Sequence, residues 1–486
     1  NRRQDAADRE EDRQRRPRQA EEIMKNKKSY VYIGLPVLGM IFYLAYIRRS
    51  AIDMVYSDYI RLINSYLPDV WNPAKFWVPD LLTRVPVNFL ARIINTTFFH
   101  YSIRFDQVLG VVSLALSAVS VTYYVNRKQI GTIWFLAVMA VMFSLNKWEM
   151  LNNGSGWVHF LAFAGFYYHY QIWDRVWGGE ERKGDHLQMI LLPWILILAV
   201  AGPYCAVYVA VLIAGYAFCM AVTWRREKRL EKRYLLYGVS VLLPFFCYLW
   251  SNAQVVPDWS GYGAAQGSLF QNLFRIPGYF IRFVLKSLAS VVTGQELAKS
   301  LWSTNLPYLA VGIFVAAAYL MALYLQFSRK LYETTVFPMV MLVSGALNHA
   351  LILLSRWSFL VEDYGMSSRY ALQFQVGVVG ILLTLALCWK ECQKAGRQVI
   401  WRGAAVLVTA IFLLGNITTT RKELQTAPYR KELCVKRAET ALDFENKTDD
   451  ELRAEFEFRT SWDQSGAMVR SALTILKENH WNVFHQ

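Results

Sequence analysis

QMILLPWILILAVAGPYCAVYVAVLIAGYAFCMAV, residues 188–222, is the stretch that decides the fold, because it contains no charged residue. A membrane-spanning helix needs about 20 apolar residues, so this stretch is too long for one span. Gly202-Pro203 lies near its centre. Proline removes a backbone donor and clashes inside a helix, so we expect the chain to break there. The stretch therefore predicts two helices that cross a membrane in succession.

The composition of the whole chain agrees with this interpretation. Its 486 residues are 55% hydrophobic and 18% charged, whereas an ordinary soluble domain is about 45–50% apolar and about 25% charged. Six scattered cysteines form no CxxC pair, which argues against a disulfide or zinc framework. The net charge of +15 does not indicate nucleic acid, because residues 1–23 and the segment after Thr418 each carry nearly balanced charges. The positive surplus belongs to the apolar body.

Apolar windows of spanning length recur along the chain and predict eleven transmembrane helices. With the N-terminus inside, every short cytoplasmic loop contains Lys or Arg, as the positive-inside rule requires. The predicted spans are 30–47, 107–125, 131–146, 157–174, 188–201, 203–222, 234–251, 306–325, 334–354, 371–388 and 400–417. The basic loops are Asn126–Gln129, Asp174–His186, Trp224–Arg233, Gln326–Leu331 and Trp389–Arg402.

The predicted fold is an all-α polytopic membrane protein in three parts. Residues 1–29 are polar and expected to be a disordered cytoplasmic N-terminus. Residues 1–23 are either a native extension or precede a natural start at Met24. Residues 30–417 form the transmembrane domain, and residues 418–486 form a small mixed or helical extracytoplasmic segment. The long outer loops are 48–106, 251–305 and 355–370.

Two outer loops carry apolar residues at helical spacing, which predicts amphipathic helices at the membrane interface. The third outer segment, 355–370, is short and polar. The periodic residues are Ile52, Val55, Tyr56, Tyr59, Ile60 and Ile63, then Phe76, Leu81, Leu82, Val85, Phe89 and Leu90, and in the second loop Phe270, Leu273, Phe274, Ile276, Tyr279, Phe280, Phe283 and Val284.

Two acidic positions in the outer segments are candidates for chemistry. Asp58 follows the first span closely, and Glu149 lies beside Trp148 at the turn between the third and fourth spans. A carboxylate at a cavity near the bilayer can act as a general base or bind a divalent cation. Alternatively, Asp53 or Asp58 only caps an interfacial helix, and Glu149 is solvated beside a tryptophan of the interfacial belt.

Cationic side chains in the outer loops provide the second set of candidates. Arg356 and Arg369 lie in the loop before the tenth span, where positive charge does not help topology, and the planar guanidinium suits a phosphate. The alternative for Arg369 is a structural ion pair with Asp363. Arg282 and Lys286 lie on the polar side of the second outer loop, where they contact lipid phosphates or snorkel to the interface.

At this point the sequence resembles the GT-C superfamily of integral-membrane glycosyltransferases, particularly its bacterial members. The resemblance is architectural over Met24–Gln486, and its motifs are short. Ser57-Asp58-Tyr59 matches the position of the family's catalytic acid in the first outer loop, and Ser368-Arg369-Tyr370 resembles its late arginine segment. Walker-type, GxGxxG and GxSxG motifs are absent from the sequence, so ATP hydrolysis, dinucleotide chemistry and serine hydrolysis have no support.

The resemblance implies a membrane glycosyltransferase in the plasma membrane of a bacterium, with its active site on the extracytoplasmic face. Its partners would be a polyprenyl-phosphate-linked sugar donor, a glycan or lipid-linked acceptor and the lipid bilayer, without nucleic acid. No cofactor is assigned. The missing DxD motif leaves the metal site unknown and Mg²⁺ or Mn²⁺ dependence open, and the missing WWD-type motif argues against a protein asparagine as acceptor.

The resemblance also implies roles for individual residues. Asp58 would accept or orient the proton of the acceptor hydroxyl, with Glu149 as the reserve acid. Arg369 and Arg356 would stabilise the charge on the departing phosphate. The donor phosphate site would also include Tyr370 and Arg282, and sugar or acceptor contacts would come from Tyr59, Arg61, Trp148 and Asp363.

Two other functions stay open at the level of sequence. A polysaccharide polymerase or ligase would also use outer arginines and a lipid-linked donor. A transporter or flippase of lipid-linked sugars is the alternative from another class, but such proteins often show two related halves and ionisable residues in mid-membrane. The predicted spans are almost free of charge and show no related halves, which argues against transport.

Overall fold

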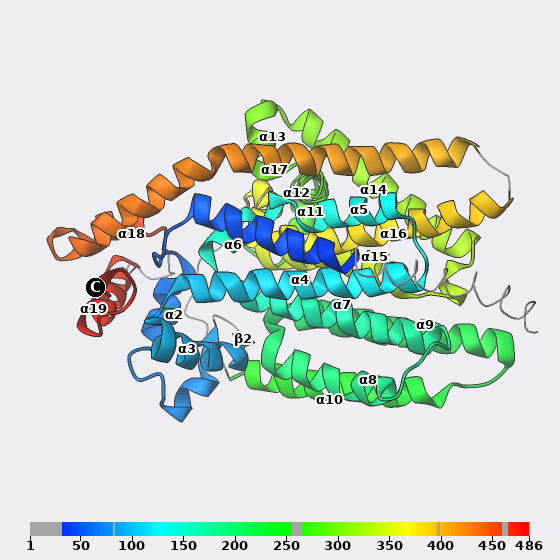
Figure 1. Cartoon of the computed structure of the whole chain (residues 1–486), viewed down its shortest axis with the longest axis horizontal. Helices are drawn as coiled ribbons and strands as arrows, with labels where there is room; N and C mark the ends of the chain where they lie inside the picture. The colour runs from blue at the N-terminus through cyan, green and yellow to red at the C-terminus, as the bar shows by residue number, and fades with distance from the viewer. Residues whose placement is uncertain (1–31, 81–82, 255–264, 396–398, 459–464, 486) are drawn as a thin grey trace, which may run out of the picture.

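The computed structural model describes residues 32–80, 83–254, 265–395, 399–458 and 465–485. The predicted N-terminal segment 1–29 lies outside these residues. In Figure 1 the long helices lie side by side along the long axis of the molecule, and short elements gather at its left-hand end. The fold is that of an α-helical polytopic membrane protein.

Eight helical segments in the described part of the chain are long and apolar enough to cross a membrane. They are Ile103–Arg127, Thr132–Asn153, Gly202–Glu227, Lys232–Asn252, Asn305–Ser328, Phe337–Phe359, Ser368–Glu391 and Trp401–Leu442. Each overlaps one of the eleven predicted spans. The structure therefore supports the membrane class, and eight spans rather than eleven meet the criteria of length and apolar character.

The other three predicted spans are also helical. Residues 32–50 form a helix, and α7 covers Trp157–Trp177. The third, Asp185–Val200, is an apolar helix too short for the same criteria. It consists of α8 (Asp185–Ile195) followed by a π-helical turn, η3 (Leu196–Val200).

The remaining elements are long and short helices, short 3₁₀ turns and one pair of short strands. The helices not yet named are α2 (Asp58–Tyr66), α3 (Pro86–Phe99), α4 (Ile103–Arg127), α5 (Thr132–Met142), α6 (Trp148–Asn153), α9 (Cys205–Glu227), α10 (Lys232–Asn252), α11 (Leu269–Arg275), α12 (Pro277–Ala289), α13 (Gln295–Leu301), α14 (Asn305–Ser328), α15 (Phe337–Arg356), α16 (Ala371–Ala395), α17 (Val399–Leu442), α18 (Asp449–Glu455) and α19 (Ser465–Glu478). Short 3₁₀ turns are η1 (Pro73–Trp77), η2 (Leu145–Lys147), η4 (Gly202–Tyr204), η5 (Leu331–Glu333), η6 (Trp357–Phe359), η7 (Glu362–Met366), η8 (Ser368–Tyr370), η9 (Phe444–Asn446) and η10 (Asn482–Phe484). Strands β1 (Pro79–Asp80) and β2 (Thr83–Arg84) pair antiparallel.

The break predicted at Gly202-Pro203 is confirmed. The chain leaves the π-helical turn, passes through η4 and enters α9. Gly202 has a φ of +50°, in the left-handed region that glycine adopts readily. The uncharged stretch is thus divided into two helices at the residue pair that favours a break.

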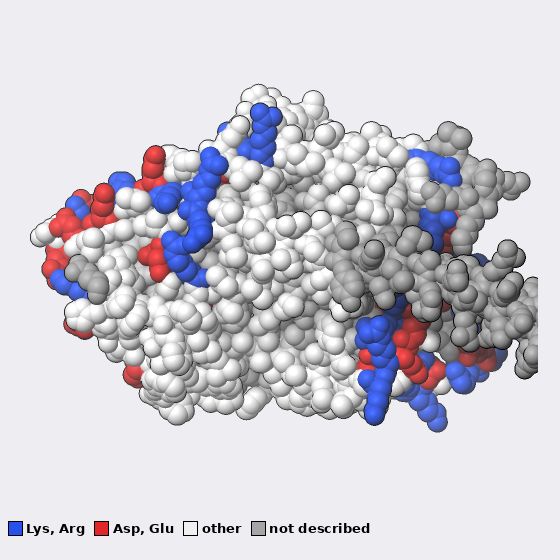
Figure 2. All heavy atoms as spheres, in the orientation of Figure 1, with Lys and Arg blue, Asp and Glu red and all other residues white. Residues whose placement is uncertain are grey.

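Charged residues gather at the two ends of the molecule and leave a broad uncharged band between them on the face shown in Figure 2. The loop between α9 and α10, the last turn of α16 and the first turn of α17 lie at the right-hand end in Figure 1. All three belong to the predicted cytoplasmic set. We call this the cytoplasmic end and the opposite end, with α2, α3, α18 and α19, the outer end, after the predicted topology.

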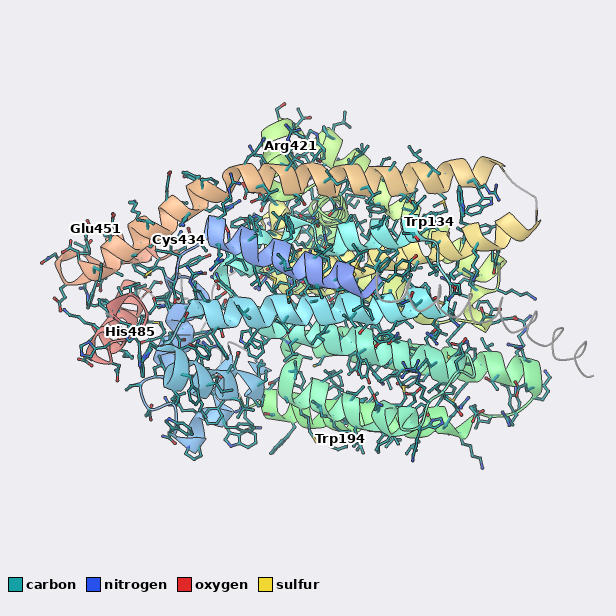
Figure 3. All side chains as sticks on the ribbon, in the orientation of Figure 1. Trp134, Trp194, Arg421, Cys434, Glu451 and His485 are labelled. Carbon is teal, nitrogen blue, oxygen red and sulfur yellow. The ribbon has the colours of Figure 1, made fainter. Side chains whose placement is uncertain are left out.

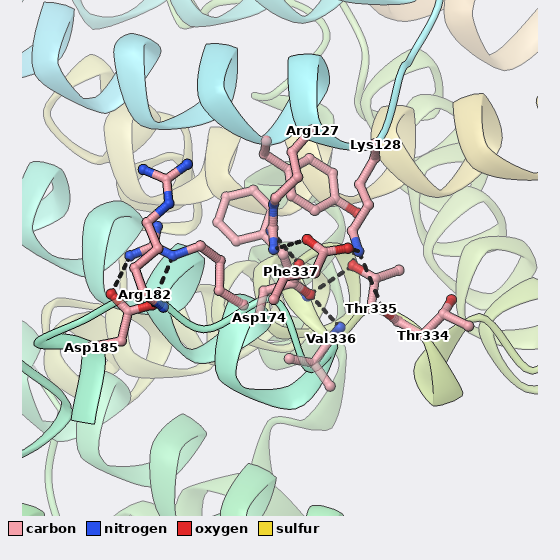
Figure 4. Close-up of polar contacts among 12 residues, drawn as sticks. Arg127, Lys128, Asp174, Arg182, Asp185, Thr334, Thr335, Val336 and Phe337 are labelled. Atoms are coloured by element: carbon pink, nitrogen blue, oxygen red, sulfur yellow. Dashed lines mark hydrogen bonds and ion pairs between the residues drawn. The ribbon is translucent and has the colours of Figure 1, made fainter.

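The buried side chain of Asp174 links the ends of three helices, α4, α7 and α15, at the cytoplasmic end (Figure 4). Asp174 Oδ1 accepts hydrogen bonds from the backbone N–H groups of Val336 (2.6 Å) and Phe337 (2.9 Å) at the start of α15. It also accepts from the Thr335 hydroxyl at 2.6 Å, and its second oxygen pairs with Arg127. Carboxylates stabilise helix N-termini, so Asp174 links the ends of α7 and α4 to the beginning of α15.

The C-terminal segment docks on the first outer loop. Tyr59, Ile60 and Ile63 of α2 are fully buried and pack in one cluster with Leu473 and Leu476 of α19. The prediction of an interfacial helix over 52–63 is therefore wrong for α2, because its apolar face is covered by protein. By contrast, α3 keeps exposed apolar side chains, including Leu90, Ile94 and Phe98.

The last predicted span does not end at residue 417. It forms the first half of α17, a single helix that continues to Leu442. Figure 3 labels Cys434 on the second half of this helix, and Glu451 and His485 at the outer end of the molecule. The long helix therefore carries the C-terminal segment outward to the first loop.

The turn between the third and fourth predicted spans is also more compact than expected. It contains η2 and α6, and it buries Lys147 completely. The ammonium donates to the hydroxyl of Tyr43 (3.1 Å) and to the carbonyls of Met142 (3.0 Å) and Ser144 (3.1 Å). These bonds tie the turn to the first helix and fix the start of α6.

Close backbone contact between α15 and α16 generates a prediction about packing. A Cβ atom at Gly345 would lie 2.4 Å from Gly377 Cα and 2.5 Å from its backbone nitrogen. Overpacking of this kind costs about 1–3 kcal/mol, so Gly345→Ala should lower the thermal unfolding temperature in detergent. The control is Gly403→Ala in α17, where no atom lies within 4 Å of the added Cβ. Equal unfolding temperatures for the two variants would contradict the packing of α15 on α16.

Candidate functional site

Arg369 lies between two carboxylates from distant parts of the chain. Its Nε donates to Glu149 Oε1 at 2.5 Å, and its Nη1 lies 3.7 Å from Asp58 Oδ2. Arg369 Nη2 reaches the Ser57 hydroxyl at 3.4 Å, and the neighbouring Ser368 hydroxyl donates to Glu149 Oε2 at 3.1 Å. We call Ser57, Asp58, Glu149, Ser368 and Arg369 the arginine cluster.

Local structure explains why these side chains converge. Asp58 is the first residue of α2, Glu149 lies in the first turn of α6, and Arg369 lies in η8 immediately before α16. The backbone N–H of Ser57 donates to the carbonyl of Phe456 at 2.8 Å, so the C-terminal segment holds the residue before Asp58. Three outer connections and the tail therefore meet at one place.

The arginine cluster is accessible to solutes. The side chains of Arg369, Asp58 and Glu149 are 43%, 39% and 21% exposed. The guanidinium faces both acids and still presents an open surface. The arrangement can bind an anion at the arginine and accept a proton at a carboxylate.

Asp58 is held in its ionised form. Desolvation by the surrounding protein raises the pKa of the Asp58 carboxyl group, but the charges of Arg61 and Arg369 and the hydrogen bond from Arg61 outweigh that effect. The pKa of Asp58 therefore lies below its ordinary value. Arg61 Nη1 lies 3.4 Å from Asp58 Oδ1, which gives this predicted residue a contact within the site.

Arg356 and Tyr370 contact each other beside the arginine cluster. Arg356 Nε donates to the Tyr370 hydroxyl at 2.8 Å, and the guanidinium also lies 5.9 Å from the centre of the Tyr370 ring. Because Tyr370 directly follows Arg369, the second predicted arginine is attached to the same turn. The two arginines are thus connected through one short segment, η8.

Two predicted site residues lie in a second cluster. Arg282 Nε donates to Glu362 Oε1 at 2.7 Å, and Lys286 Nζ contacts Asp363 Oδ1 at 2.8 Å and Glu362 Oε2 at 3.2 Å. The alternative of an Arg369–Asp363 ion pair is therefore wrong, because Asp363 pairs with Lys286 and Arg369 pairs with Glu149. We call these four residues the lysine cluster.

The structure gives Tyr59 and Trp148 packing contacts. Tyr59 is fully buried and donates its hydroxyl to Asp106 Oδ2 at 2.7 Å, and Asp106 in turn pairs with Arg92. Tyr59 therefore does not face a solute in this structure. The guanidinium of Arg430 lies over the indole of Trp148, 3.1 Å from the ring centre, so one face of Trp148 is covered.

Asp53 has the capping role that the sequence left open for it. Its Oδ1 accepts from the backbone N–H of Ile103 at 2.8 Å, and its Oδ2 accepts from the Ser102 hydroxyl at 2.5 Å. It caps α4 rather than an interfacial helix of its own loop. Asn482 of the C-terminal segment donates to Asp53 Oδ1 at 3.1 Å, the oxygen that also accepts from Ile103.

Sequence reasoning missed the participation of the C-terminal segment. Arg437 of α17 lies over the ring of Tyr56, 4.4 Å from its centre, and Asn64 donates to the Met468 carbonyl at 3.0 Å. No local pattern identifies partners that lie about 400 residues apart in the sequence. The sequence feature that set the tail apart was its nearly balanced charge. That feature does not indicate which part of the protein the tail contacts.

Among the described residues, no group of three or more His, Cys, Asp or Glu side chains is arranged to hold a metal ion. Comparison with protein-family models, curated proteins and solved structures finds no match for this chain.

The pKa of Asp58 leads to a prediction about pH. A carboxyl group whose pKa is lower in the folded chain stabilises it above the unfolded pKa, and this contribution is lost as the pH falls through the folded value. The difference in thermal stability between the native chain and Asp58→Asn should be constant from pH 7 to about pH 5 and should shrink below about pH 4.

The control for this series is Asp450→Asn on α18, since that side chain is 88% exposed. Its effect should be small at every pH. A stability difference for Asp58→Asn that shrinks between pH 7 and pH 5 would mean that the pKa of Asp58 is raised, contrary to the geometry.

Proposed function

We propose that the chain is a membrane glycosyltransferase that transfers a sugar from a polyprenyl-phosphate carrier to a cell-surface glycan or lipid-linked acceptor on the outer side of the membrane. The observation that carries this proposal is the position of Arg369 between Asp58 and Glu149 at accessible sites. The GT-C resemblance is based on the segments that contain Asp58 and Arg369, and these lie together despite their separation in sequence.

The charges of Asp58 and Arg369 suit two different roles in the proposed reaction. Asp58 remains ionised and can accept a proton, while Arg369 remains cationic and can stabilise a phosphate. Glu149 holds the guanidinium in place through its 2.5 Å hydrogen bond. This assigns Glu149 a positioning role, with Asp58 as the base.

In the proposed reaction, the acceptor hydroxyl oxygen forms a bond to the anomeric carbon of the donor sugar. The bond between that carbon and the phosphate oxygen breaks, and its electron pair leaves with the polyprenyl phosphate. The hydroxyl proton passes to Asp58. Arg369, supported by Arg356 through Tyr370, stabilises the charge that develops on the leaving phosphate.

The membrane character of the chain supports a lipid-linked donor. The arginine cluster lies at the outer end of the candidate span Ser368–Glu391, where α16 meets the outer connections. A polyprenyl chain requires apolar surroundings, whereas its phosphate requires cations at the boundary of the bilayer. Arg369 provides such a cation two residues before the start of α16.

The base is tested by Asp58→Asn. The substitution keeps the size of the side chain and removes the proton acceptor, so kcat for sugar transfer should fall by about 10²–10⁴-fold. Binding of the donor, measured as its effect on thermal stability, should persist. Asp450→Asn serves as the matched control and should keep full activity, while full turnover in Asp58→Asn would remove Asp58 from the mechanism.

The phosphate site is tested by Arg369→Ala. The thermal shift that a polyprenyl-phosphate donor causes should decrease strongly, because the guanidinium that meets the phosphate is lost. Arg421→Ala is the control, since Arg421 is exposed on α17 (Figure 3). An unchanged donor shift in Arg369→Ala would mean that Arg369 serves only as a structural ion pair.

A further inference from the structure

A separate polar cavity of about 330 Å³ lies beside the lysine cluster. It is lined by residues from α12, the turn between α13 and α14, the first turn of α14, and η7. The lining residues are Lys286, Trp302, Ser303, Thr304, Asn305, Tyr308 and Asp363. Ligand pockets in proteins have volumes of about 300–1,000 Å³, so the cavity can hold a small ligand.

The charges around the cavity balance. Lys286 and Arg282 provide two cations, and Glu362 and Asp363 provide two carboxylates, all held in mutual ion pairs. A phosphate would meet the carboxylate of Asp363 at the cavity wall, and a cation would meet the ammonium of Lys286. Lys286 is 7% exposed and contacts both carboxylates, whereas Arg369 in the arginine cluster is 43% exposed and keeps a surface open to an anion. The cavity at the lysine cluster therefore favours a neutral ligand over an ion.

The lining groups suit a polyhydroxylated ring. Lys286 is more than nine-tenths buried, and its ammonium has three donors, of which two point to carboxylates. Asp363 contributes carboxylate oxygens, and Ser303, Thr304 and Asn305 contribute small polar groups. Trp302 and Tyr308 pack edge to face, with ring centres 4.8 Å apart. Tyr308 is buried and its ring lies 5.5 Å from Lys286 Nζ, so Trp302 is the aromatic side chain left to contact a ligand in the cavity.

Aromatic rings contact the apolar faces of sugars, and neighbouring polar groups bind their hydroxyls. We propose that this cavity is a carbohydrate subsite that binds one neutral sugar ring, with Trp302 beside the ring and Lys286 and Asp363 on its hydroxyls. Its polar lining distinguishes it from a pocket for a lipid chain.

The connection between α15 and α16 joins this subsite to the arginine cluster. Asp363 in η7 and Arg369 in η8 lie on that one connection, and Met366 between them packs with Tyr308 and Trp302. Identification of the bound ring as part of the acceptor glycan rests on the proposed glycosyl transfer. The binding of a sugar in the cavity does not depend on that proposal.

The experiment measures sugar binding directly. The purified full chain in nanodiscs is mixed with the methyl glycosides of glucose, galactose, mannose and N-acetylglucosamine, and binding is followed by saturation-transfer NMR on the sugars. Ser303→Trp fills the cavity from an exposed position and should weaken binding about tenfold or more. Ser300→Trp, on the exposed face of neighbouring α13, should leave binding unchanged.

Each result has a defined meaning. Binding that Ser303→Trp removes and that Ser300→Trp and Asp58→Asn retain supports the subsite. Absence of binding by all four sugars, or binding that Ser303→Trp does not change, overturns it. Inorganic phosphate that binds more tightly than the sugars at the Ser303-sensitive site overturns the assignment to a neutral ligand. The sugar transfer assay with Asp58→Asn is independent, so the proposed function and the subsite can fail separately.

Discussion

The contact of Arg369 with Glu149 and Asp58 is the interaction on which the proposed site depends. It connects the last turn before α16 to the first turn of α6, and the same guanidinium approaches Asp58 at the start of α2. A charge at the edge of an apolar helix requires partners, because an unpaired charge near lipid is costly. Two carboxylates satisfy that requirement while leaving the guanidinium accessible, so one contact serves both folding and the proposed binding of phosphate.

The two ends of the molecule are organised by different means. At the cytoplasmic end, a buried Asp174 receives backbone and side-chain donors and fixes the entry into α15. At the outer end, the C-terminal segment covers α2 and bonds to the backbone of Ser57. A rigid bundle with anchored ends can hold the side chains of the arginine cluster within the small distances that catalysis requires.

Much of the fold was predictable from sequence because membrane helices are recognised by local hydropathy. The break at Gly202-Pro203 and the gathering of basic loops at one end both follow from local composition. The partner of Arg369 was not predictable in this way, since the sequence does not distinguish Glu149 from Asp363. The fold places Glu149 of α6 beside Arg369 and Asp363 of η7 beside Lys286. Burial of α2 was missed because its cover, α19, lies about 400 residues later. The continuation of α17 beyond residue 417 was missed because hydropathy locates the apolar part of a helix and not its end.

The central claim is that the arginine cluster receives the phosphate of a lipid-linked donor. A photoreactive polyprenyl-phosphate, with its reactive group next to the phosphate, tests this most directly when the crosslinked peptides are identified by mass spectrometry. The account predicts labelling of the segments that contain Asp58, Glu149 and Arg369, and competition by unmodified polyprenyl phosphate. Labelling confined to the cytoplasmic end, around Arg127 and Asp174, would contradict it.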